Sequence, residues 1–200
     1  MNMFSKVIRR THMYLALFLA PWMLMYALST IVMNHRALFQ RGYGGRPPAW
    51  EKEREQSYSG TFPAGASGRM IAEQMLNDLR MEGAHNVSGP AAGGRITIVR
   101  QDPIAPRRIT YSAADQKVVI EKQVFRTPAF LERMHRRRGY QHPYVLEDTW
   151  AFSVDLVIFA LVFWVASGLW MWWEMRPTRV WGAAFSAIGA GLFGLFLFTI

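Results

Sequence analysis

Three long apolar runs constrain this chain more than any other feature of its sequence. They cover residues 13–33, 150–173 and 181–200. A helix needs roughly 20 apolar residues to cross the hydrocarbon core of a bilayer, and each run reaches that length. Because lipid offers no hydrogen bonds to exposed backbone groups, such runs must form helices. The sequence therefore predicts three transmembrane helices.

The three runs differ in the residues that interrupt them. The first holds no charge and contains Pro21, which membrane helices tolerate. The second holds Asp155 near its start and four tryptophans in its far half, which is typical of an interfacial aromatic belt. The third is rich in glycine, and small residues let membrane helices approach closely. We therefore expect Gly182 and Gly189 to contact a partner helix or lipid.

Short charged flanks indicate how the helices are oriented. Lys6, Arg9 and Arg10 precede the first run, while Arg176 and Arg179 lie between the second and third. With three spans these two flanks share a side, and the positive-inside rule makes that side cytoplasmic. The segment between the first and second spans then faces outward. A cleavable signal peptide is the alternative for the first run, but its apolar part is longer than such peptides have.

These features divide the chain into an ordered set of segments. Residues 1–12 form a cytoplasmic N-terminus, and residues 174–180 form a cytoplasmic loop. The transmembrane helices occupy residues 13–34, 150–173 and 181–200. Residues 35–149 form an extramembrane domain on the outer, periplasmic side.

The domain has the pattern of a small α+β fold. Ser67 is a suitable N-cap for an amphipathic helix that we expect to stop at Gly83. Two or three strands follow, at residues 95–100, 108–111 and 117–121. We expect a solvated charged segment at residues 51–55 and an interfacial helix at residues 128–138. One helix and so few strands make a thin core.

Charge and cysteine content exclude several classes of function. The chain has no cysteine, which rules out disulfides, thiolate catalysis and cysteine-ligated metal centres. Its net charge of +9 is spread over both flanks of the spans and favours anionic lipid over nucleic acid. Arg136, Arg137 and Arg138 form the densest basic cluster, which suits lipid phosphate, an acidic partner surface or an anionic ligand. We expect one of these arginines to pair with Asp155.

Several short motifs resemble the PepSY-associated transmembrane helix family. Residues 9–16 resemble the family's opening helix, with its basic residue and histidine, and residues 27–30 close that helix where the family usually has a Thr-Gly pair. The hairpin at 111–120 is similar to that of a PepSY domain, although Asp115 and Gln116 replace its usual Thr-Gly. Residues 131–136 resemble the family's Leu-His-Arg segment, and 167–173 its closing Gly and Trp-Trp signature. The resemblance implies a short, three-helix member of the bacterial inner membrane.

Larger members of the family include haem-binding, siderophore-iron reductases, so the histidines are candidate ligands for haem b. On the outer side these are His35, His135 and His142, with His35 and His135 as the preferred pair; on the inner side there is His12. The alternative for each is an ordinary structural position: a headgroup-level residue for His12, a helix end for His35 and His142, and plain surface for His85. One inner histidine cannot complete a bis-histidine site within one copy.

The sequence favours a non-enzymatic function. It contains no phosphate-binding loop, no zinc-protease helix and no nucleophile elbow, so no catalytic or metal-ligating residue is assigned. We expect an accessory, structural or assembly subunit of a larger membrane complex, without a cofactor, in contact with the bilayer and with other membrane subunits or further copies. The alternative is an electron-transfer subunit that carries one outer haem b.

Overall fold

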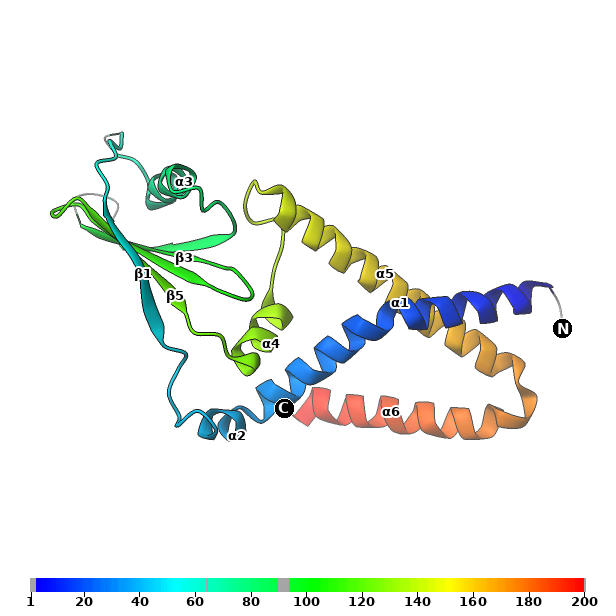
Figure 1. Cartoon of the computed structure of the whole chain (residues 1–200). Coiled ribbons are helices and arrows are strands. Elements are labelled where there is room, and N and C mark those ends of the chain that lie inside the picture. The colour runs from blue at the N-terminus through cyan, green and yellow to red at the C-terminus, as the bar shows by residue number, and fades with distance from the viewer. Residues whose placement is uncertain (1–2, 64, 90–93, 200) are drawn as a thin grey trace. The chain divides into compact units, whose positions relative to one another are not determined.

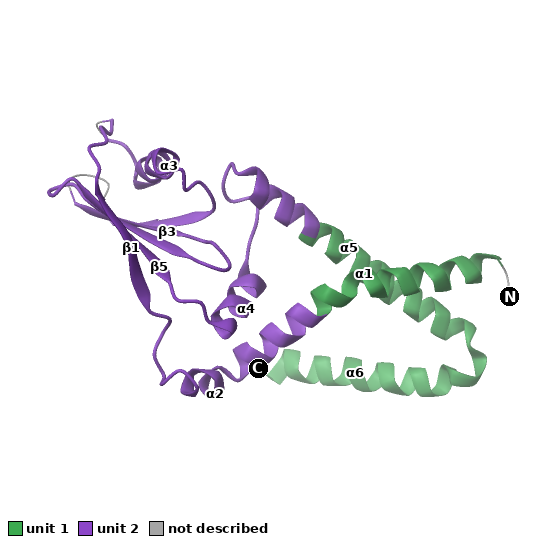
Figure 2. Ribbon diagram, in the orientation of Figure 1, with its two compact units in different colours: residues 1–23, 154–200 green, residues 24–153 purple. Residues whose placement is uncertain are grey.

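The computed structural model describes residues 3–63, 65–89 and 94–199 (Figure 1). Residues 1–2 and 200, which belong to the predicted N-terminal segment and third span, lie outside the described residues. The chain divides into two compact units, one of residues 1–23 and 154–200 and the other of residues 24–153 (Figure 2). Two of the long helices contribute to both units.

Within the described residues, three helices are long and apolar enough to cross a membrane. They are α1 (Met3–Asn34), α5 (Val145–Glu174) and α6 (Arg179–Thr199). The predicted architecture, three candidate membrane-spanning helices with an α+β domain inserted after the first, is thereby confirmed. Helices α1 and α5 begin before the apolar runs within them, because hydropathy marks the stretch suited to lipid and not the end of the helical backbone.

In the first unit, α1 packs against α5 through a small apolar cluster. Leu19 of α1 lies against Val157 and Ala160 of α5, and these three side chains are buried. At one end of the contact the Ser5 hydroxyl donates to the Glu174 carboxylate over 2.6 Å. A carboxylate in an apolar helix is thus supplied with a hydrogen-bond donor from the neighbouring helix.

The inserted domain contains a five-stranded antiparallel sheet with the order β1-β5-β4-β3-β2. Alternate residues of its central strands point to one face, where α3 (Gly68–Asp78) covers them (Figure 1). Ile98, Ile109 and Val118 are fully buried there against Met75 of α3. The strands are β1 (Trp50–Ser57), β2 (His85–Ser88), β3 (Arg95–Arg100), β4 (Arg107–Ser112) and β5 (Lys117–Gln123).

Helix α3 begins where the sequence predicts and ends earlier. The Ser67 hydroxyl accepts a hydrogen bond from the Met70 N–H, as an N-cap does. The predicted end at Gly83 is wrong, because the helix stops at Asp78 in a Schellman motif: Arg80 takes a φ of 53°, and the Met81 N–H reaches the Leu76 carbonyl. Arg80 occupies the left-handed position after the helix where glycine is usual, so the sequence has no glycine to mark this helix end.

Two strands were not expected. Residues 51–55 are exposed, as predicted, and Lys52 pairs with Glu55, but they also belong to β1, an edge strand that pairs with β5 across a bulge between Lys52 and Arg54. Most residues of β1 are exposed, so its sequence lacks the alternation of apolar and polar residues that marks a half-buried strand. Strand β2 is only four residues long and was also missed. The sheet is therefore larger than the two or three strands predicted.

A short helix at 36–41 was not predicted, whereas the one that begins at Thr127 was. Helix α2 (Arg36–Arg41) comes directly after α1, and α4 (Thr127–Arg136) begins with Pro128 in its first turn. Helix α4 ends before the predicted residue 138, because Arg137 has an extended backbone.

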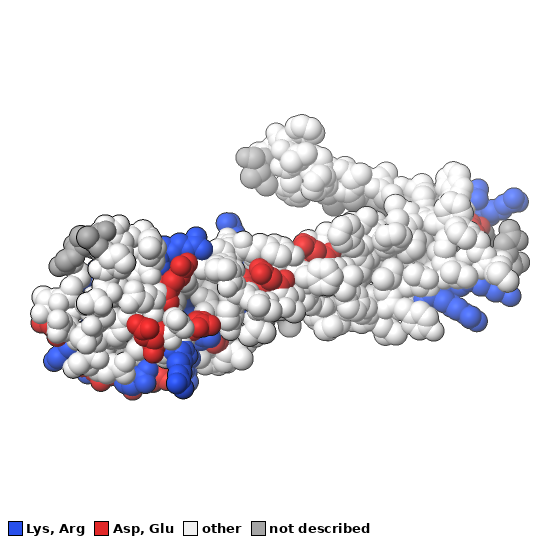
Figure 3. Space-filling view, turned by 90° about the horizontal axis from the view of Figure 1, so that it is seen from above, with Lys and Arg blue, Asp and Glu red and all other residues white. Residues whose placement is uncertain are grey.

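On the face drawn in Figure 3, the domain carries charges of both signs, while the surfaces of the long helices are largely uncharged between their ends.

Mutations can test which face of the sheet packs against α3. Ile98→Ala is expected to lower the free energy of unfolding by about 2–5 kcal/mol, because it leaves a cavity in a fully buried site. Val119 lies on the opposite face and is only half-buried, so Val119→Ala should cost less. Chemical denaturation of the full chain in detergent measures both; equal costs would contradict the assigned face.

Candidate functional site

His135 joins α4 to the end of α1. Its Nδ1 lies 2.7 Å from the hydroxyl of Ser29, a fully buried residue, and the Tyr26 ring meets the imidazole edge to face. The Ser29 hydroxyl donates its single proton to the Tyr26 carbonyl, so its oxygen accepts from the His135 Nδ1–H. With the Ser29 hydroxyl donating in this direction, a neutral His135 carries its proton on Nδ1 and a lone pair on Nε2.

His12 has the same arrangement in the first unit. Its Nδ1 lies 2.8 Å from the Ser167 hydroxyl, which donates to the Trp164 carbonyl. The imidazole also stacks on the Trp164 ring, with the two centroids 5.3 Å apart. Gly168 passes close by, where a β-carbon would come within 3.3 Å of the imidazole. A neutral His12 thus also carries its proton on Nδ1.

His142 links the start of α5 to the sheet. Its Nδ1 lies 3.1 Å from the carboxylate of Glu147, which is 1% exposed, and its Nε2 lies 2.8 Å from the His85 carbonyl. The His142 imidazole is therefore the hydrogen-bonding partner of the buried Glu147 carboxylate. The His85 ring lies against the His142 ring at an interplanar angle of 41°, and its Nδ1 lies 2.9 Å from the Gly83 carbonyl oxygen.

His85 is not plain surface, as was expected, but is 6% exposed. Its place in the short strand β2, which the sequence did not reveal, explains the error. Glu147 was missed because an acid in the first turn of a helix commonly faces solvent beside the helix dipole. No pattern in the sequence separates this carboxylate from the exposed Asp148 beside it.

The other predicted site residues take less distinctive positions. His35 is exposed at the start of α2, and its side chain does not cap that helix with a hydrogen bond. Its pairing with His135 around a haem stays a prediction, as does the pairing of Asp155, exposed in α5, with an arginine.

The two glycines predicted to contact a partner have different surroundings: Gly182 lies against the Trp172 indole, whereas a β-carbon at Gly189 would meet nothing within 4 Å. Among residues 3–63, 65–89 and 94–199, no group of three histidine or acidic residues is arranged to hold a metal ion.

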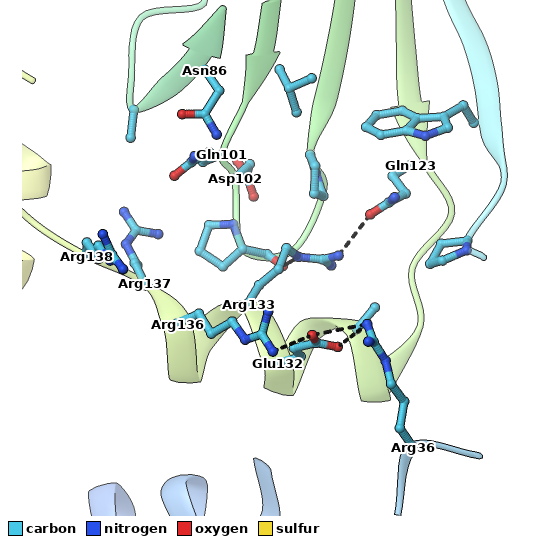
Figure 4. Close-up of a pocket in the computed structure, with 17 residues that line it drawn as sticks. Arg36, Asn86, Gln101, Asp102, Gln123, Glu132, Arg133, Arg136, Arg137 and Arg138 are labelled. Carbon is cyan, nitrogen blue, oxygen red and sulfur yellow. Dashed lines mark hydrogen bonds and ion pairs between the residues drawn. The ribbon is translucent and has the colours of Figure 1, made fainter. Parts of the chain in front are cut away.

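The arginine cluster lines a cavity of about 480 Å³ (Figure 4). The cavity lies between α4 and the ends of several strands, and Trp50, Val99 and three prolines form its apolar part. Its lining carries five arginines and two carboxylates. The arginines are Arg36, Arg133, Arg136, Arg137 and Arg138, and the carboxylates are Asp102 and Glu132. The sequence identified three of these arginines but not the cavity that they share with Arg36 and Arg133.

The two carboxylates are already engaged. Glu132 pairs with Arg36 at 3.2 Å and with Arg136 at 3.4 Å. Burial alone would raise the pKa of Asp102, but hydrogen bonds from the Ala105 and Ile104 N–H groups, with the nearby Arg100, lower it below its ordinary value. Asp102 is therefore a fixed anion of the loop and contributes no titrating group near neutral pH.

The arginines are held in different ways. Arg133 donates to the Pro103 carbonyl and to the Gln123 side chain, and burial lowers its pKa from the ordinary value without discharging it. Arg137 lies over the Trp150 ring, with its guanidinium carbon 5.4 Å from the centroid. Arg138 is exposed. The cavity thus combines fixed positive charge with an apolar wall.

Comparison with known proteins gives no family assignment, since no family model, curated protein or solved structure matches the chain. The resemblance to the PepSY-associated family therefore stays a prediction.

The His142–Glu147 pair is suited to a double-mutant cycle. His142→Ala leaves a buried carboxylate without its partner and is expected to lower the free energy of unfolding by about 3–5 kcal/mol. The double variant with Glu147→Gln should cost less than the sum of the single changes. Denaturation of all four proteins at neutral pH measures the coupling; additive costs would show that the two residues do not interact.

The hydrogen bonds of Asp102 predict a pH dependence. Because its folded pKa lies below the unfolded value, the carboxylate stabilises the domain above the unfolded pKa and loses this effect as pH falls through the folded pKa. Asp102→Asn is expected to cost about 1–2 kcal/mol at pH 7 and to flatten the decline in acid. Unfolding measured from pH 7 to pH 3 tests this; an unchanged acid slope would contradict it.

Proposed function

We propose that this chain is an accessory subunit of a larger complex in the bacterial inner membrane, of the PepSY-associated type and without catalytic activity of its own. It would place its α+β domain on the periplasmic side, with the N-terminus in the cytoplasm. Helices α1 and α5 would hold the domain at the membrane, and α6 would associate with another subunit or another copy.

The main observation that supports this proposal is the exposure of α6. None of its described residues is buried within the chain, although the helix is long and apolar. Gly189, Gly191 and Gly194 have open space where a side chain would extend, so no contact within the chain requires their small size. In membranes, small residues are common where a second helix packs closely.

Site-specific crosslinking in native membranes tests the proposal. Because the chain has no cysteine, single cysteines can be introduced without background. A cysteine at Gly189 is expected to form defined adducts with one partner or with a second copy, while a matched cysteine at Ile158, an exposed position of α5, should not. A chain that yields no adduct from any turn of α6 would contradict an accessory subunit that uses this helix.

A second candidate, a b-haem electron-transfer subunit, is favoured by the matching geometry of His12 and His135. Histidines that ligate metals generally donate their other ring N–H to a fixed acceptor, and in both residues a serine oxygen accepts from Nδ1. Each Nε2 is left with the lone pair that an axial ligand needs. Bound haem would supply one-electron chemistry, and each histidine would need a second ligand from another copy or a partner.

Optical spectra of the purified full-length protein distinguish the two candidates. A Soret band with sharp reduced α and β bands, lost in His135→Ala or His12→Ala, would support the haem protein. His35→Ala tests the pair preferred from sequence, and His85→Ala serves as the control. A featureless spectrum from protein purified with haem supplied during expression would remove the second candidate and leave the first.

A further inference from the structure

The arginine-lined cavity has more positive charge than its own carboxylates balance. Five arginines face two carboxylates, and Glu132 is already shared by Arg36 and Arg136. The Arg137 guanidinium lies over the Trp150 ring, and the Arg138 side chain is exposed. The guanidinium groups present planar forks of N–H donors, which suit phosphate oxygens. The cavity therefore has the charge and the donors of an anion site.

The position of the cavity indicates where the anion comes from. Arg36 starts α2, directly after the membrane-spanning helix α1 ends at Asn34. Helix α4, which carries Arg133 and Arg136 and is followed directly by Arg137 and Arg138, is joined to the last turns of α1 by the hydrogen bond between His135 and Ser29. The arginines thus lie beside the last turns of a helix suited to lipid, at the depth where phospholipid headgroups are found.

An apolar groove continues from the cavity along α1 and α2. A smaller hollow of about 140 Å³ shares Arg36, Pro48, Ala129 and Glu132 with the arginine-lined cavity. The same hollow shares Val32, Phe39, Tyr43 and Pro128 with a groove of about 680 Å³. That groove is lined mainly by apolar side chains, among them Leu28, Ile31, Leu38 and Leu131.

This series of hollows changes from charged to apolar along its length. Arg126 adds a further cation at the middle hollow, where its guanidinium lies over the Tyr43 ring and donates to the Arg46 carbonyl. A free phosphate or an acidic peptide would use the arginines but leave the apolar groove empty. An amphiphile with an anionic head and an acyl chain would occupy both ends.

We propose that residues 28–43 and 126–138, with the adjoining strand ends, bind one anionic phospholipid. Its phosphate lies among Arg133, Arg136, Arg137 and Arg138, and an acyl chain lies in the groove beside Leu38 and Leu131. The bound lipid completes the contact between the domain and α1. This proposal does not depend on the accessory-subunit function or on haem.

Lipid binding to the full-length chain in mild detergent tests the proposal. Native mass spectrometry with equal concentrations of dioleoyl phosphatidylglycerol and phosphatidylcholine measures the apparent affinity for each. Wild-type protein is expected to retain one phosphatidylglycerol in preference to phosphatidylcholine. The double change Arg137→Gln and Arg138→Gln should weaken phosphatidylglycerol binding by roughly tenfold or more, since each removes a charged donor.

Matched variants separate a built site from general attraction. Arg54→Gln with Arg95→Gln removes the same charge from strands outside the cavity and is expected to leave binding unchanged. Arg138→Gln alone alters an exposed side chain and should weaken binding without affecting the fold. Leu38→Gln changes an exposed side chain of the groove and should weaken binding of the lipid but not of inorganic phosphate.

Three results would overturn the proposal. Equal loss of binding in the two double variants would indicate non-specific electrostatic attraction. Inorganic phosphate that displaces the lipid at similar concentrations, together with no effect of Leu38→Gln, would indicate a small-anion site. Equal affinity for phosphatidylglycerol and phosphatidylcholine would show that the arginines do not select an anionic lipid.

Discussion

The need to satisfy polar groups inside lipid governs how this chain is built. Backbone groups in the long apolar helices are bonded within each helix, and the Ser29 and Ser167 hydroxyls donate to carbonyls of their own helices, but their oxygens and the Glu174 carboxylate have room for a further hydrogen bond. The structure supplies each with a partner from another segment: His135 for Ser29, His12 for Ser167 and Ser5 for Glu174. These polar pairs also fix where the helices and α4 meet.

The same principle explains the junction between the domain and α5. Glu147 has almost no exposed surface, and a carboxylate so deeply buried is tolerated only with a hydrogen-bonding or charged partner. His142 meets this need and at the same time reaches the backbone of β2. The thin core of the domain is thereby supplemented by polar contacts to the helix that follows it, and by those of α4 to α1.

Sequence reasoning succeeded where one physical property dominates a long segment. Hydropathy identified the three long helices, and the β-branched run around Ile98 identified β3. It failed where tertiary contacts decide the structure. The charged residues of β1 form a strand because β5 offers an edge for pairing, and Arg80 ends α3 in a conformation that favours glycine. The arginine cavity likewise joins Arg36 to residues a hundred positions away, which no local pattern reveals.

The proposed topology places the α+β domain and the α5–α6 connection on opposite sides of a membrane. Cysteine labelling tests it directly, because the chain has no cysteine of its own. With a membrane-impermeant maleimide, a cysteine at Ala114, in the exposed turn before β5, should react in intact spheroplasts. A cysteine at Thr178, between α5 and α6, should react only after lysis. Labelling of both positions, or of Thr178 alone, in intact spheroplasts would contradict the account.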